Sequence, residues 1–205
     1  MSQPTPFRYL KSGQPCVTRD MRKKHEKTIA KDHCYFVGFR VTLENEMRYQ
    51  HSQILADDYE ALIAGIDEER RMILKRQLAT AVSDIEPVFV RNLLMHEASM
   101  IDSIEKIGIS SEIQKTLLRR DDHRFTVLSR SGSEQIYLVH ENAQDALTAM
   151  RLTRLHNINL AANDFQPLDV RHAHPAAKEF DSLFHQVANQ FLILLESSRR
   201  IGHQH

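Results

Sequence analysis

The segment spanning residues 176–195 constrains the fold of this chain more than any other part of the sequence. Its apolar residues recur at the i, i+3, i+4 and i+7 spacing of an amphipathic helix that packs on a core. A polar stripe runs along the opposite side until Ile193 follows Asn189 by one turn, and from Phe191 the helix is apolar all round. The sequence therefore predicts a long helix whose last turns need a cover, either from this chain or from a partner.

We expect a protein partner to bind the apolar end of this helix, together with the turns that lead to it. The predicted partner-binding residues are Phe184, Val187, Phe191, Leu192, Ile193, Leu194 and Leu195. Both a hetero-oligomer and a homo-oligomer fit this pattern. Periodicity alone does not distinguish a helix at the centre of a domain from a helix at an interface, so both readings stay open at this point.

Length and charge narrow the class of protein. The 205 residues fit a single domain over 1–205, in which 1–31 form an extended, basic N-terminal segment. The 27 basic side chains balance 27 acidic ones, which removes any bulk attraction to nucleic acid or to an anionic membrane. Two cysteines do not make a disulfide framework, and no apolar run is long enough to span a membrane. A soluble cytoplasmic protein with no membrane insertion is the expectation.

The hydrophobic pattern predicts an α+β fold, a predominantly helical single domain with a small antiparallel sheet. Residues 34–43 read as a strand in which Gly38 marks a bulge. The helical period takes over between residues 52 and 83, where Gly65 weakens the middle of the helix. Pro87 then separates this helix from a second one expected over residues 88–107.

The second half of the chain is expected to hold a hairpin between helices. A short helix capped by Ser110 or Ser111 is predicted through Leu118. Residues 125–129 and 135–140 follow as two strands joined by a loop that contains Gly132, a hairpin near 125–140. Asn142 with Asp145 resembles a helix cap, and the helix it opens should stop near Asn163, before Pro167. No repeat with a period of 20–50 residues stands out.

The sequence carries no motif for catalysis, a metal or a cofactor. His172, His174 and His185 could in principle supply three imidazoles, but their spacing matches no closed metal signature, and surface or capping roles explain them better. The Ser131-Gly132-Ser133 cluster falls in the expected hairpin loop and lacks the surroundings of a nucleophile elbow. Cys34 reads as a small core residue. We therefore expect no enzyme activity, no cofactor, no metal and no small-molecule substrate.

A basic cluster near the N-terminus supports an alternative function. Such a patch can hold phosphates or an acidic segment of a protein, yet no aromatic residue lies between Met21 and Ile29 to stack on bases. A winged-helix-like arrangement over residues 111–160 is a second route to a nucleic-acid-binding regulator, although its helix begins with Ser111-Glu112 instead of basic residues. Nucleic acid is therefore the alternative partner and not the leading one. The basic patch comprises Arg19, Arg22, Lys23, Lys24, Lys27 and Lys31.

The FLILL run at residues 191–195, in a chain without an active-site motif, resembles the accessory and chaperone subunits of bacterial secretion systems. The resemblance implies binding to a type IV coupling protein and to small chaperone subunits, with a role in presenting exported substrates. It carries no functional residue over to this chain. Together with the balanced charge, it favours a non-enzymatic adaptor or chaperone-like protein-binding subunit.

Overall fold

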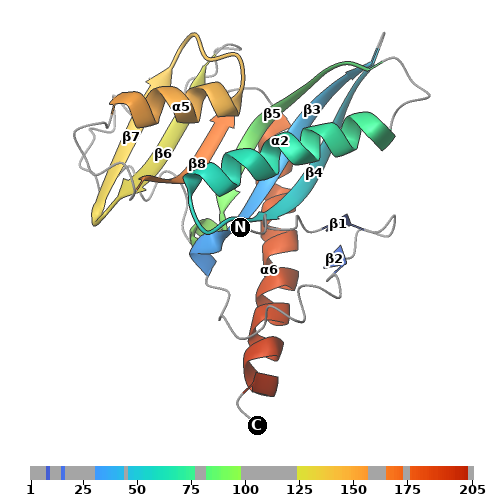
Figure 1. Cartoon of the computed structure of the whole chain (residues 1–205), viewed down its shortest axis with the longest axis vertical. Helices are drawn as coiled ribbons and strands as arrows, with labels where there is room; N and C mark the ends of the chain where they lie inside the picture. The colour runs from blue at the N-terminus through green and yellow to red at the C-terminus, as the bar shows by residue number, and fades with distance from the viewer. Residues whose placement is uncertain are drawn as a thin grey trace.

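The computed structural model describes residues 8–9, 15–16, 31–43, 46–76, 82–97, 124–156, 165–172 and 176–202. Six of the described strands form one antiparallel sheet in the order β4-β3-β5-β8-β6-β7 (Figure 1). They are β3 (Cys34–Leu43), β4 (Glu46–Leu55), β5 (Val82–Asn92), β6 (Phe125–Ser131), β7 (Glu134–His140) and β8 (Phe165–His172). The described α-helices are α2 (Tyr59–Arg76), α5 (Ala146–His156) and α6 (Ala176–Gly202). Shorter elements are η1 (Lys31–His33), η2 (Leu93–His96) and the pair β1 (Arg8–Tyr9) and β2 (Pro15–Cys16).

The sheet is built from two units that share the same order of elements. In the first unit, the hairpin β3-β4 is followed by α2 and then by β5, which pairs with β3. In the second unit, the hairpin β6-β7 is followed by α5 and then by β8, which pairs with β6. The two units meet where β5 pairs with β8, so that the last strand of each ββαβ unit lies at the centre of the sheet.

The register at this central pairing relates the two units by a local two-fold axis. Val90 lies opposite Val170, and each valine follows a proline by three residues, Pro87 in β5 and Pro167 in β8. Each proline lies next to a register shift, where a bulge tolerates the missing N–H. A cross-strand hydrogen bond also recurs, from Arg40 to Glu86 in the first unit and from Arg130 to Gln166 in the second.

The two faces of the sheet are covered by different helices. α2 and α5 lie over one face, where their apolar side chains join those of both units in a common core. α6 packs on the other face, where its apolar side chains meet β3 and β5 in a second cluster. Figure 1 shows α6 continuing well past the end of the sheet toward the C-terminus. One stretch of α6 is thus covered by the sheet, and another extends beyond it.

The expectation of a predominantly helical domain with a small sheet is wrong, because strands are about as abundant as helices and form a six-stranded sheet. The helix expected over residues 88–107 is replaced by β5 and η2 as far as His96. Pro87, expected to separate two helices, lies within β5 beside a bulge. β4 occupies residues expected to begin the first helix, which instead starts at Tyr59.

Several local expectations are confirmed, and others are corrected. β3 has the predicted bounds, but the bulge expected at Gly38 has its extra residue, Val88, in the partner strand β5. The hairpin β6-β7 is present with a tighter turn at Gly132 and Ser133. α5 is capped by Asp145, whose Oδ1 accepts a hydrogen bond from the Thr148 N–H, and not by Asn142. The expected short helix over 111–118 lies outside the described residues.

Candidate functional site

An aromatic cluster fixes the covered part of α6 on the sheet. The ring of Phe36 on β3 lies 5.9 Å from that of Phe89 on β5 and 5.9 Å from that of Phe184 on α6, both in edge-to-face geometry. Phe180, one turn earlier on α6, has its ring 5.8 Å from those of Phe89 and Tyr49. Such pairs add to the free energy gained by burial. The N-terminal half of α6 is therefore held by the core of its own chain.

Gly38 allows α6 to approach β3 closely. A Cβ atom at this position would lie 2.8 Å from three ring atoms of Phe180, which is closer than side chains pack. The glycine thus leaves room for an aromatic ring directly over the strand. A similar fit occurs on the opposite face, where a Cβ at Gly65 of α2 would lie 2.6 Å from Cγ2 of Ile54. Gly65 therefore serves helix packing, which explains its place in the middle of α2.

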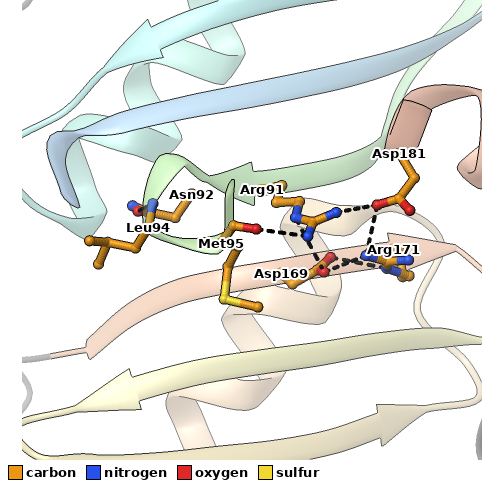
Figure 2. Close-up of polar contacts among 7 residues, drawn as sticks. All are labelled: Arg91, Asn92, Leu94, Met95, Asp169, Arg171 and Asp181. Atoms are coloured by element: carbon orange, nitrogen blue, oxygen red, sulfur yellow. Dashed lines mark hydrogen bonds and ion pairs between the residues drawn. The ribbon is translucent and has the colours of Figure 1, made fainter. Parts of the chain in front are cut away.

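A charged cluster, in which Arg91 and Asp169 are buried and Arg171 and Asp181 are half-buried, joins both ββαβ units to α6 (Figure 2). Arg91 of β5 is only 1% exposed and donates to Asp181 of α6 and, at 2.9 Å, to the carbonyl oxygen of Met95. Its Nε lies 3.8 Å from Oδ2 of Asp169 on β8. Arg171, the residue equivalent to Arg91 in the second unit, donates to both oxygens of Asp169, with its Nε 3.0 Å from Oδ1. Two positive and two negative side chains therefore meet at the local two-fold axis.

This cluster determines the position of α6 more than it adds stability. Burial lowers the pKa of Arg91, and the carboxylates of Asp169 and Asp181 oppose that shift. The guanidinium also lies over the ring of Phe184, with its Cζ atom 4.5 Å from the ring centroid. Because desolvation offsets much of the Coulomb attraction of a buried ion pair, its clearest effect is to penalise other placements of the helix. No local sequence pattern predicts the cluster, because its members come from three separate segments.

Only some of the predicted partner-binding residues are exposed. Ile193 is 63% exposed, whereas Leu192 and Leu195 are half-buried. Exposed polar residues lie one turn from Ile193 on either side, Asn189 before it and Glu196 after it. Apolar surface within a polar rim is the usual anatomy of a small protein interface. Three of the predicted residues lie in the core against the sheet, Phe184, Val187 and Phe191, and the side chain of Leu194 lies outside the described ones.

Of the residues predicted for nucleic-acid binding, the structure describes only Lys31 and part of the 111–160 region. Lys31 in η1 lies 3.9 Å from the carboxylate of Glu97. The rest of the basic patch, Arg19, Arg22, Lys23, Lys24 and Lys27, lies outside the described residues. The hairpin β6-β7 does not project as a wing, because β6 pairs on both sides within the sheet. The described part of the 111–160 region therefore belongs to the six-stranded sheet and to α5, which covers it.

The remaining polar candidates are explained by packing. His172 is buried with its ring 4.7 Å from that of Phe125, and His185 lies beside His96, whereas His174 is outside the described residues. Among the described residues, no three His, Cys, Asp or Glu side chains are close enough to hold a metal ion. Burial raises the pKa of the Cys34 thiol, which disfavours the reactive thiolate.

Two concave features differ greatly in size. The cavity between α6 and strands β3 and β4 measures about 10 Å³, room for one water molecule at most. An open groove of about 550 Å³ lies between α2 and β5, lined by Asp67, Arg70, Arg71, Leu74 and Asp84 among others. Both acidic residues and arginines line this groove. Asp67, Arg70 and Arg71 already form ion pairs along α2. Neither feature selects a ligand of one charge.

Within the described residues, no helix is both long and apolar enough to cross a membrane. The chain matches no protein-family model, no curated protein and no solved structure.

Proposed function

We propose that this chain is a non-enzymatic, cytoplasmic protein-binding subunit that captures a partner through the part of α6 that extends past the sheet. The observation that carries this proposal is the 63% exposure of Ile193 on a helix whose earlier turns are anchored by buried aromatic and charged contacts. A rigid helix that presents an apolar side chain loses little conformational entropy on binding. The sequence resemblance to secretion-system accessory subunits fits the same role.

The chemistry of the surface restricts the kind of partner. Ile193, Leu192 and Leu195 offer apolar contact, while Asn189 and Glu196 offer hydrogen bonds at the rim. An amphipathic helix of a partner protein satisfies such a surface by packing its apolar stripe along α6. Phe191 is buried in the chain's own core and so holds this part of α6 in place. We expect Ile193 to supply a large share of the binding free energy.

The test replaces Ile193 with aspartate and uses Leu155→Asp as the matched control. Leu155 is 61% exposed on α5 and lies on the opposite face of the sheet from α6, so both variants remove a comparable exposed apolar side chain. Both proteins should melt within about 2 °C of the wild type, because exposed positions contribute little to stability. Affinity purification from the native cell identifies the partner, and titration calorimetry with the purified partner then measures its affinity.

We expect Ile193→Asp to weaken binding of that partner at least about tenfold, which corresponds to roughly 1.4 kcal/mol, while Leu155→Asp leaves it unchanged. Equal affinity of the wild type and Ile193→Asp would exclude α6 as the binding surface. A large loss of melting temperature in Ile193→Asp would instead place this side chain in the core.

A further inference from the structure

Strand β7 forms one outer edge of the sheet. It pairs with β6 along all seven residues without a register shift, so the edge is regular and carries no bulge. Among the described elements, no strand pairs with its other side. At the opposite edge, β4 is contacted by β1. The two ββαβ units thus differ in what the described chain places against their outer strands.

Edge strands of monomeric proteins are usually protected against pairing with another chain. Common devices are lysines, prolines, bulges or a covering segment. The sequence of β7, EQIYLVH, contains neither lysine nor proline. Its central side chains, from Ile136 to Val139, are only half-buried within the chain. The strand therefore has the composition of one that gains from a further strand beside it.

The sequence of β7 is complementary to itself in the antiparallel direction. When Tyr137 lies opposite Tyr137 of a second copy, all seven residues pair, which is the longest overlap this strand permits. On the face of the sheet that carries α5, Glu134 then lies opposite His140, and Ile136 lies opposite Leu138. On the other face, Gln135 lies opposite Val139. Ile136 with Leu138 is an aliphatic pair and Tyr137 with its copy is an aromatic pair, and both combinations stabilise neighbouring strands.

From this edge and its register, we propose that two copies of this chain associate through antiparallel pairing of their β7 strands, centred on Tyr137. A two-fold axis perpendicular to the sheet relates the copies and joins their two six-stranded sheets into a continuous one. The even-numbered side chains of β7 face α5, because Nε2 of His140 lies 2.7 Å from Oγ1 of Thr153 on that helix. The balanced net charge of the chain opposes association only weakly. This surface is separate from the end of α6.

Sedimentation velocity on the full chain tests the association. We expect a shift from a 23.8 kDa monomer to twice that mass as the concentration rises from about 1 to about 200 µM, because pairing of one strand buries a modest area. Gln135→Lys places a lysine opposite Val139 of the other copy and should raise the dimer dissociation constant at least about tenfold. Gln186→Lys makes the same substitution at an exposed position of α6, away from β7, and as the matched control should leave that constant unchanged.

Cysteine cross-linking tests the register, in a background in which Cys16 is replaced by serine. Tyr137→Cys places two thiols at facing positions within disulfide distance, and mild oxidation should link the two chains. Gln135→Cys places its thiols about four residues apart along the paired strands and should not link them. A chain that remains monomeric at every concentration overturns the proposal. So does a dimer that is indifferent to Gln135→Lys, or one that links through Gln135→Cys and not through Tyr137→Cys.

Discussion

At the scale of single residues, Gly38 is the position at which the fit between α6 and the sheet is tightest. Because an added methyl group would lie 2.8 Å from the ring of Phe180, Gly38→Ala forces a packed aromatic side chain to move. Overpacking of this kind costs about 1–3 kcal/mol of unfolding free energy, measurable by urea denaturation. Phe180→Leu in the Gly38→Ala background should recover part of that loss, since the smaller side chain makes room. Simple additivity of the two substitutions would contradict a clash between these residues.

The residue scale also shows what the sequence could and could not predict. The extra residue of the bulge beside Gly38, Val88, lies in the partner strand β5, whereas β3 itself was predictable from its β-branched and aromatic residues. The charged cluster was not, since Arg91, Asp169 and Asp181 meet only after three elements have packed together. For α6 the prediction was correct in part. Periodicity showed that Ile193 interrupts the polar stripe of the helix, but it did not show that Phe184 is buried against the sheet.

At the scale of elements, the two helices on the shared face begin in the same way. Asp58 Oδ1 accepts a hydrogen bond from the Ala61 N–H at the start of α2, as Asp145 does for Thr148 at the start of α5. Asp58→Ala and Asp145→Ala should each lower the unfolding free energy by about 1 kcal/mol in urea titrations. Asp57→Ala is the matched control, because the neighbouring carboxylate is exposed and lies 3.7 Å from His33. A loss in this control as large as in Asp58→Ala would show that general charge, and not capping, stabilises α2.

The elements that sequence patterns failed to predict are strands interrupted by proline. β5 and β8 contain Pro87 and Pro167, and a proline within an apolar run ordinarily argues against a central strand. The bulges beside them remove that conflict, because the backbone there does not need a ladder N–H. Bulges depend on the partner strand and leave no signal in the strand that contains the proline. The uninterrupted strand β3 was therefore predictable, whereas these two were not.

At the scale of the whole molecule, the fold is a pair of ββαβ units around one axis with a single helix breaking the symmetry. The strands EPVFVRN of β5 and QPLDVRH of β8 occupy equivalent places, yet they differ where α6 packs, with Phe89 in one unit and Asp169 in the other. The first unit thereby gains an aromatic surface for α6, and the second contributes the carboxylate that pairs with both arginines. The two units follow each other at a spacing longer than 20–50 residues, so no period in that range reveals them.

The pH dependence of stability is a property of the whole molecule, because histidines in three regions contribute in the same direction. Burial lowers the pKa of His51 on β4. It also lowers the pKa of His140 on β7 and His185 on α6, where the positive charges of His156 and Arg91, respectively, add to the effect. Each imidazole therefore takes up a proton less readily in the folded chain than in the unfolded chain, where the pKa is 6.5. Below that pH the unfolded state binds more protons, so the unfolding free energy decreases as pH falls. Urea denaturation at pH 7.5, 6.5 and 5.5 should show a loss that is larger in the lower interval than in the upper one, and His51→Gln should reduce it. A stability that rises on acidification would contradict the burial of these rings.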